Sequence, residues 1–167
     1  MKIYLITDTH FNHKKLIEYG RPEDFDDLLY KGLKELPLDC LLIHLGDICI
    51  GNDEAVHRHI NQATGSLIKK ILVRGNHDKK SNNWYLEHGW DFVCEQFSDT
   101  YFGKKILFSH IPVAWDGYYD LNIHGHFHDS DHRRHEKELM AIKNGYQKLL
   151  ALEYTDYKPI LLEKFIN

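Results

Sequence analysis

Short apolar runs recur along the chain, and five of them end just before polar residues of the types that bind metals. Buried strands of a sheet read as short, continuous apolar runs. In α/β sheets the chemically active residues lie just beyond the carboxyl ends of the strands. The pattern therefore predicts that separate segments bring Asp, Asn and His side chains to one edge of a sheet. The five segments are Ile3–Ile6 before Asp8 and His10, Cys40–Leu45 before Asp47, Ile71–Val73 before Asn76, His77 and Asp78, Ile106–Phe108 before His110, and Leu121–Ile123 before His126 and His128.

Amphipathic segments between these runs predict helices. The first spans residues 24–36, where apolar residues recur at the spacing of one helical face. Asp24 can cap this helix and Pro37 ends it. Residues 52–64 repeat the pattern, and residues 82–88 form a shorter candidate. Alternating strands and helices are typical of βαβ units, so we expect a sheet that is at least partly parallel.

The second half of the chain is richer in predicted strands. Apolar segments over residues 91–94, 106–109, 149–154 and 160–164 read as strands separated by turn residues. They favour a second sheet packed on the first. The highly charged segment 129–143 fits either a loop or a short exposed helix.

Length and composition fit a single domain over residues 1–167. The chain is 43% hydrophobic and 28% charged, which is ordinary for a globular protein. A net charge of −4 argues against a global basic field for nucleic acid. No apolar run approaches the ~20 residues of a membrane helix, and no signal-peptide pattern precedes the first predicted strand.

Two residue types refine this picture. Three cysteines, an odd number without paired spacing, argue against a disulfide framework and for a reducing compartment, so we expect a cytoplasmic protein. Histidine is in marked excess, with thirteen copies, and five of them directly follow the apolar runs. We expect most of the other eight on the surface or on helices. They are His13, His44, His57, His59, His88, His124, His132 and His135.

The residues after the runs form a ligand set for metal ions. Asp8 and His10 are two apart on an extended segment, as are His126 and His128, so each pair points to one side. Two carboxylates, one amide and four imidazoles exceed the needs of one tetrahedral ion and suit two ions that share a carboxylate. Without a thiolate, the set suits Mn, Fe, Zn or Ni. Two such ions roughly 3.5–4 Å apart can hold a hydroxide for attack on phosphorus, so the sequence predicts a hydrolase.

Each motif alone has an ordinary structural explanation. A lone Asp-x-His or Gly-Asp commonly belongs to a turn. A lone His after a strand, such as His110, is more often a hydrogen-bonded structural residue. All five motifs in this order, each after a predicted strand, form a specific combination.

In combination, the motifs resemble those of the calcineurin-like metallophosphoesterases. They read Asp8-Thr9-His10, Gly46-Asp47, Gly75-Asn76-His77-Asp78, His110 and Gly125-His126-Phe127-His128. The resemblance spans residues 8–128 and implies an α/β fold, a two-sheet β-sandwich flanked by helices. It also implies two divalent metal ions, with Mn as the first candidate and Fe, Zn or Ni as alternatives. Asp8, His10, Asp47 and His128 would hold one ion, Asp47 would bridge, and Asn76, His110 and His126 would complete the other.

One position departs from the family signature Gly-Asp-x-x-Asp, because Ile50 stands where the second Asp is expected. Metal binding should survive, since the family does not use that residue as a ligand, and Asp53 is a candidate for supplying its outer support. The resemblance places His77 beside the substrate phosphate. There an imidazolium can stabilise charge and protonate the leaving oxygen, and Asp78 could orient its ring.

His13 and Arg21 follow the first motif as they do in a similar small subgroup of the family. Both are candidates for contacting the substrate, Arg21 through its planar fork of donors. A histidine at a helix start and a salt-bridged arginine are equally open interpretations.

The chain is thus predicted to be a phosphodiesterase in which a metal-bridging hydroxide attacks phosphorus and His77 assists the leaving group. A short chain without an obvious cap indicates an open site for small phosphoesters, cyclic phosphates or nucleic-acid ends. We expect no membrane association and no obligate protein partner. A phosphomonoesterase or nucleotide pyrophosphatase with the same metals is one alternative. A non-catalytic scaffold on the same fold is another, although it should lack His77 or several ligands.

Overall fold

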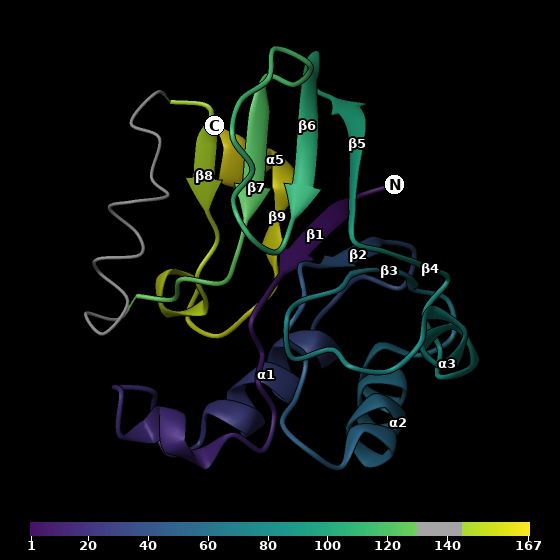
Figure 1. Cartoon of the computed structure of the whole chain (residues 1–167). Coiled ribbons are helices and arrows are strands. Elements are labelled where there is room, and N and C mark those ends of the chain that lie inside the picture. The colour runs from purple at the N-terminus through teal and green to yellow at the C-terminus, as the bar shows by residue number, and fades with distance from the viewer. Residues whose placement is uncertain (130–144) are drawn as a thin grey trace.

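Two stacked β-sheets form the framework of the computed structural model, which describes residues 1–129 and 145–167 (Figure 1). The first sheet has the strand order β4-β3-β2-β1-β9. Strands β1 to β4 run parallel, and β9 is antiparallel to β1. The strands are β1 Ile3–Ile6, β2 Leu41–His44, β3 Lys69–Val73, β4 Phe92–Cys94 and β9 Ile160–Leu161.

The second sheet has the strand order β5-β6-β7-β8. Strands β5 and β6 form an antiparallel pair, whereas β6, β7 and β8 run parallel. The strands are β5 Gln96–Tyr101, β6 Lys104–Ser109, β7 Leu121–His124 and β8 Gln147–Leu149. The arrows of β1, β6 and β7 end toward the same side of the molecule, so the loops after them can meet (Figure 1).

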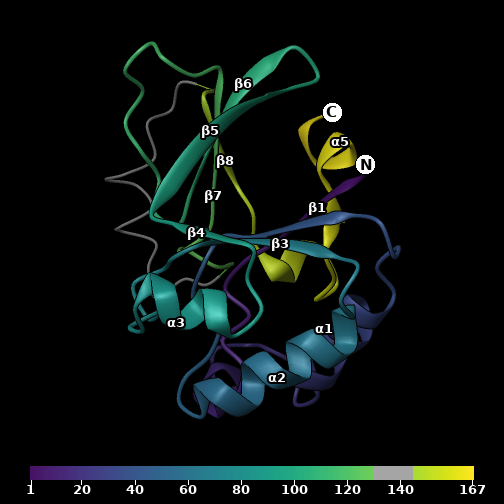
Figure 2. The same cartoon turned by 90° about the vertical axis from the view of Figure 1, so that its right-hand side faces the viewer.

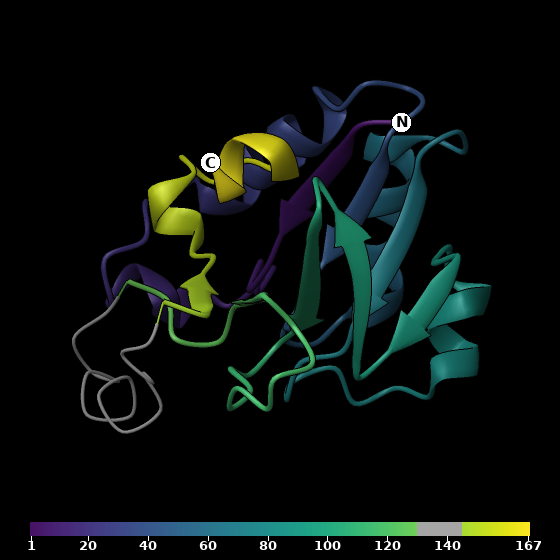
Figure 3. The same cartoon turned by 90° about the horizontal axis from the view of Figure 1, so that it is seen from above.

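Helices cover the first sheet on the face that points away from the second (Figure 2). They are α1 Phe25–Lys34, α2 Asp53–Thr64 and α3 Asn82–Glu87. Shorter helical turns are η1 Lys14–Ile17, η3 Leu152–Tyr154 and α5 Leu162–Ile166. Seen from above, the yellow α5 lies beside β1 (Figure 3). Among the helices of residues 1–129 and 145–167, none is both long and apolar enough to span a membrane.

The first sheet is buried on both faces, which explains its continuous apolar runs. Leu42 and Leu72 belong to the hydrophobic cluster shared with the helices. Their neighbours Ile43 and Val73 belong to the cluster that also contains Phe108 of the second sheet. All five side chains are fully buried. Successive residues of a strand point to opposite faces, so one run supplies both layers of the core.

The two-sheet α/β architecture flanked by helices is confirmed, and the three predicted helices are present. Strand β5 went unpredicted because most of its side chains are exposed and polar. The predicted strand over 149–154 is wrong, since β8 ends at Leu149 and a 3-10 helix follows. The strand over 160–164 is also wrong beyond Leu161. Leu162 and Ile166, four residues apart, instead bury one face of α5.

Two further expectations concern the charged segment and the histidines. The segment 129–143 lies outside the described residues except for Asp129. The expectation that most remaining histidines lie on the surface or on helices does not hold for His44 and His124, which end buried strands. His57 lies on a helix as expected, on the buried face of α2 and in contact with Trp84.

Candidate metal centre

Backbone hydrogen bonds join the loop after β1 to the loop after β2, and the loop after β6 to the loop after β7. Asp8 donates its amide to Gly46 O at 2.9 Å. Gly125 donates in the same way to His110 O at 3.0 Å. The His126 amide donates to Asp8 Oδ2 at 2.9 Å, which joins the β7 loop to the β1 loop. The predicted convergence of distant segments is therefore seen in the backbone as well as in the side chains.

Two groups of side chains lie at this meeting point. The first cluster is Asp8, His10 and His128, and the second cluster is Asp47, His110 and His126; in each, the candidate ligand atoms lie within 4.8 Å of one another. Asp47 Oδ2 is 3.4 Å from His110 Nε2 and 3.6 Å from His10 Nε2, so this oxygen faces both clusters. Asn76 Oδ1 lies 3.0 Å from His110 Nε2, beside the second cluster.

The first cluster fits a divalent cation. Asp8 and His10 are 2% and 3% exposed, yet Asp8 Oδ1 and His10 Nδ1 have no hydrogen-bond partner among the described residues. Asp8 Oδ1 faces His128 Nε2 at 3.5 Å and His10 Nε2 at 3.8 Å. A buried carboxylate oxygen without a hydrogen-bond partner is costly, and a metal ion would satisfy it. The mixed oxygen and nitrogen donors suit a transition metal of the kind predicted.

Glycines allow the loops to approach the ligands closely. A Cβ on Gly75 would lie 2.2 Å from Asp47 Oδ1, and one on Gly125 would lie 2.3 Å from Asp8 Oδ2. The ligand loops are also strained, because residues other than glycine rarely adopt a left-handed backbone. Five candidate ligands do so: Asp8, His10, Asp47, His126 and His128. Strain of this kind is common at functional sites, at roughly 1–3 kcal/mol per residue.

The electrostatics of the clusters keep their carboxylates ionised. Burial opposes ionisation of Asp8, but the neighbouring His128, His110 and His10 outweigh it and hold its pKa well below the usual range. Burial also opposes ionisation of Asp47, whose pKa is lowered by its contact with His110. Burial lowers the pKa of His10 to about 3. Burial alone would lower the pKa of His110, but the contact with the Asp47 carboxylate outweighs it and raises the pKa to about 9. A metal ion bound by His110 would therefore displace the proton of its ring.

His77 and His13 lie at the rim of the first cluster. The His10 ring centroid is 5.4 Å from that of His77 and 5.6 Å from that of His13. The His77 side chain is 39% exposed, and its Nε2 is 3.9 Å from Asp47 Oδ2. Its backbone amide donates to Asp47 Oδ1 at 2.7 Å, which fixes the loop beneath the ring. Both histidines thus lie close to the candidate ligands.

Asp78 braces two ligand loops. Its carboxylate is buried and accepts hydrogen bonds from the amides of Gly75 at 2.7 Å, Asp47 at 2.8 Å and Ile48 at 3.1 Å. Burial raises its pKa to about 6, although these amides oppose the shift. The carboxylate therefore has a backbone role, in place of the contact with the His77 ring considered from the sequence.

Removing this carboxylate should destabilise the loops. We expect Asp78→Ala to lower the free energy of unfolding of the metal-free protein by about 3 kcal/mol, because buried amides lose their acceptor. Urea denaturation followed by circular dichroism measures the change. The control is Asp99→Ala, which removes an exposed carboxylate on β5 and should stay within about 0.5 kcal/mol. Equal stability of the two variants would contradict the bracing role.

Arg21 does not lie in the open part of the site. It is 5% exposed, and its guanidinium donates to Asp8 O at 2.8 Å, Thr9 O at 3.1 Å and Glu153 Oε1 at 3.2 Å. The geometry favours the salt-bridged interpretation of Arg21 over substrate contact. Asp53, the candidate for replacing the missing carboxylate at Ile50, instead contacts Cys49 Sγ at 3.5 Å and Lys80 Nζ at 4.0 Å.

Sequence reasoning missed two residues behind the ligands. His44 Nδ1 accepts from the Gly46 amide at 3.0 Å, and its Nε2 lies 3.0 Å from Thr9 Oγ1, so the ring links the β1 and β2 loops. Its position at the end of an apolar run was the available signal. Glu153 faces His128 from η3, with Oε1 3.8 Å from Nδ1. Nothing in the sequence near Glu153 marks this role.

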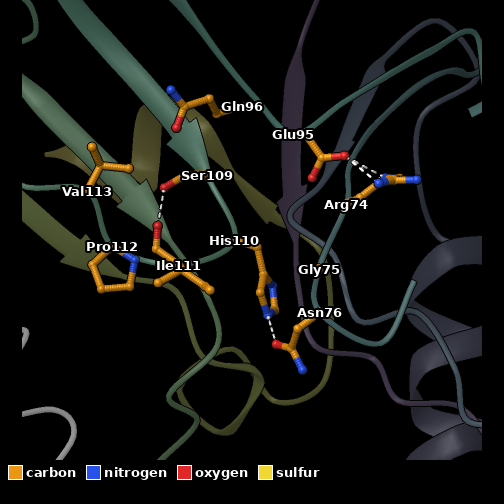
Figure 4. Close-up of a pocket in the computed structure, with 10 residues that line it drawn as sticks. All are labelled: Arg74, Gly75, Asn76, Glu95, Gln96, Ser109, His110, Ile111, Pro112 and Val113. Carbon is orange, nitrogen blue, oxygen red and sulfur yellow. Dashed lines mark hydrogen bonds and ion pairs between the residues drawn. The ribbon is translucent and has the colours of Figure 1, made fainter. Parts of the chain in front are cut away.

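A cavity of about 420 Å³ adjoins the second cluster (Figure 4). The side chains of Asn76 and His110 point toward each other at one end of it. The loop after β6 contributes an apolar wall that includes Ile111, Pro112 and Val113. Across the cavity from this wall lies Arg74, which pairs with Glu95, and Gln96 lines the cavity on the side of Ser109 (Figure 4). The cavity can hold an organic group next to the candidate metal ligands.

The fold is that of a class of phosphoesterases, and the two clusters of Asp and His could each hold a metal ion. The family model for calcineurin-like phosphoesterases matches residues 1–160, so the chain belongs to the calcineurin-like phosphoesterase family. Members of this family typically bind divalent metals, and the two Asp and His clusters suit such ions.

Two similar proteins cover the chain almost completely, and a third covers three quarters of it. The uncharacterized protein MJ1445 of Methanocaldococcus jannaschii is 30% identical over 175 residues, which cover 99% of this chain and 90% of that protein. The crystal structure of AQ665 from Aquifex aeolicus, a protein of unknown function, is 29% identical, with a TM-score of 0.75 and coverage of 98% and 96%. The Pseudomonas putida nuclease MPE is 21% identical, with a TM-score of 0.50 and coverage of 75% and 61%, a likeness of fold alone.

Proposed function

We propose that the protein is a dinuclear-metal-dependent phosphodiesterase. The observation that carries this proposal is the position of Asp47 Oδ2, 3.6 Å from a histidine of the first cluster and 3.4 Å from one of the second. In this proposal Asp8, His10 and His128 bind one ion, Asn76, His110 and His126 bind the other, and Asp47 is shared. Mn is the expected metal, and Fe, Zn or Ni would also suit the ligand set.

The chain's own residues divide the remaining work. When bound, the two ions would neutralise the phosphate and activate water. His77, exposed at the rim, donates a proton to the leaving oxygen. His13, whose ring centroid is 5.6 Å from that of His10, contacts a non-bridging phosphate oxygen. The Asp78 carboxylate holds the Asp47 loop beside the loop that carries His77, because it accepts hydrogen bonds from the backbone amides of Asp47 and Gly75.

The cavity beside the second cluster supports a diester substrate. A diester carries two organic groups on phosphorus, and the cavity offers one of them an apolar wall and polar side chains. Small diesters, cyclic phosphates and nucleic-acid ends have such groups. A phosphomonoesterase or pyrophosphatase would use the same metals, but the cavity favours the diester. The full set of candidate ligands and His77 argues against a non-catalytic scaffold. Three free cysteines fit the expected reducing cytoplasm.

Substrate preference tests the proposal directly. With Mn added, we expect kcat/KM for bis-p-nitrophenyl phosphate to exceed that for p-nitrophenyl phosphate by about tenfold or more, which is about 1.4 kcal/mol of transition-state discrimination. Release of p-nitrophenolate is followed by absorbance. EDTA should stop the reaction and excess Mn should restore it. Preference for the monoester would overturn the diester assignment, and activity that is insensitive to EDTA would overturn the metal dependence.

A further inference from the structure

A buried ion pair lies directly behind the first cluster. Arg21 Nε and Glu153 Oε1 are 3.2 Å apart, and their side chains are 3% and 18% exposed. The pair joins the segment after η1 to the 3-10 helix η3. Buried charges are costly unless they are paired and hydrogen-bonded. The hydrogen-bond partners of Arg21 and Glu153 therefore indicate the role of this pair.

Arg21 holds the β1 loop that carries two candidate ligands. Its Nη2 donates to Asp8 O at 2.8 Å and its Nη1 donates to Thr9 O at 3.1 Å. This backbone is strained, since φ is 49° at Asp8 and 44° at His10. The two hydrogen bonds from the planar guanidinium thus stabilise the strained backbone of the β1 loop.

Glu153 holds the β7 loop from the other side. Its Oε2 accepts from the Asp129 amide at 3.4 Å, next to His128. His128 Nε2 faces Asp8 Oδ1 at 3.5 Å, and its Nδ1 faces Glu153 Oε1 at 3.8 Å and Arg21 Nη2 at 3.0 Å.

This geometry gives Glu153 a defined task. For Nε2 of His128 to bind a metal, Nδ1 must carry the hydrogen, and that hydrogen requires an acceptor. Arg21 has donors only, so Nδ1 is the acceptor in its 3.0 Å contact with Nη2. Glu153 Oε1 lies 3.8 Å from Nδ1, beyond hydrogen-bond distance, and it is the carboxylate that can accept once Nδ1 carries the hydrogen.

The second cluster has separate supports. His110 Nδ1 donates to Leu45 O at 2.7 Å, and Asp47 Oδ1 accepts from the His77 amide at 2.7 Å. The hydrogen bonds of Arg21 and Glu153 go instead to the backbones of Asp8, Thr9 and Asp129 and to the His128 ring. The β7 loop also carries His126, but its ring faces His110, with Nδ1 3.2 Å from His110 Nε2. We propose that the Arg21–Glu153 pair positions the ligands of the first metal ion and leaves the second ion unaffected. This inference rests on the proposed dinuclear function.

Isothermal titration of the metal-stripped full chain with MnCl₂ tests the inference without using activity. We expect two sites in the unaltered protein. In Glu153→Ala, one site should keep its affinity and the other should weaken by about 10–100-fold, the usual cost of losing an outer partner of a metal-bound histidine. Glu153→Gln retains an acceptor oxygen and should lie between the two. Electron paramagnetic resonance at two equivalents of Mn should show loss of spin coupling in Glu153→Ala.

The matched control is Glu35→Gln, which removes an exposed carboxylate 3.5 Å from Lys158 Nζ and should leave both sites unchanged. Far-UV circular dichroism identifies variants that fail to fold, in which case Glu153→Gln provides the comparison. Two unchanged sites in a folded Glu153→Ala, or equal weakening of both sites, would overturn this inference alone. A single site in the unaltered protein would overturn the dinuclear function itself, and the inference with it.

Discussion

Replacing Asp47 with Asn should abolish most of the activity and remove both metal ions. One oxygen of Asp47 faces a histidine of each cluster, at 3.6 Å and 3.4 Å, and the side chain is buried. An amide of the same shape keeps the packing but removes the charge that the two sites would share. We expect kcat/KM for a phosphodiester to fall by at least about 10³-fold, which corresponds to about 4 kcal/mol of lost transition-state stabilisation.

Two measurements separate this effect from damage to the fold. Elemental analysis after dialysis against Mn should find about two ions per chain in the unaltered protein and less than one in Asp47→Asn. Asp39→Asn is the matched control, because Asp39 is an exposed residue that precedes β2, whereas Asp47 follows it. The control should keep full activity. If Asp47→Asn kept two ions and an unchanged kcat/KM, the assignment of Asp47 as a shared metal ligand would be wrong.

Replacing His77 with Asn should slow the reaction without loss of metal. The ring is 39% exposed at the rim, and only its backbone amide bonds to a candidate ligand among the contacts described above. General acid catalysis contributes typically about 10²–10⁴-fold, and its share grows as the leaving group becomes more basic. We therefore expect kcat to fall by about 10³-fold with an alkyl leaving group and by much less with p-nitrophenolate.

The dependence on the leaving group distinguishes a proton donor from a residue that only binds phosphate. Steady-state kinetics with a nucleoside alkyl diester and with bis-p-nitrophenyl phosphate give the two values. His59→Asn replaces an exposed histidine on α2 and should leave both unchanged. An equal decrease with both substrates would assign His77 to phosphate binding rather than to proton transfer. Loss of Mn from the His77→Asn variant would instead assign His77 as a metal ligand.

The framework was predictable because its signals are local. Leu42 and Ile43 lie on opposite faces of β2 and both are fully buried, so the run around them could only be an interior strand. Strand β5 gave no such signal, because Gln96 and most of the following side chains face solvent. Residues 160–166 contain apolar positions that fit both a strand and a helix, and packing against β1 decides for α5 after Leu161.

The site was predictable in its candidate ligands but less so in their supports. The ligands stand in motifs, whereas the partners of Arg21 and Asp78 are set by the folded chain. Arg21 pairs with Glu153, a residue 132 positions away, and the sequence cannot tell such a carboxylate from a substrate phosphate. Asp78 accepts from backbone amides, and every residue but proline has an amide to offer. Side-chain identity therefore says little about that contact.

The pairing of β1 with β9 has a consequence for the newly made chain. Strand β1 leads to the first candidate ligands, but its outer edge stays unpaired until Ile160 and Leu161 add to it. During synthesis, this edge cannot close before residues 160 and 161 have left the ribosome. Until then the open strand can join a neighbouring polypeptide, as uncovered edges do. The first sheet is therefore completed long after β1 is made, and truncation of the chain before Ile160 should favour aggregation.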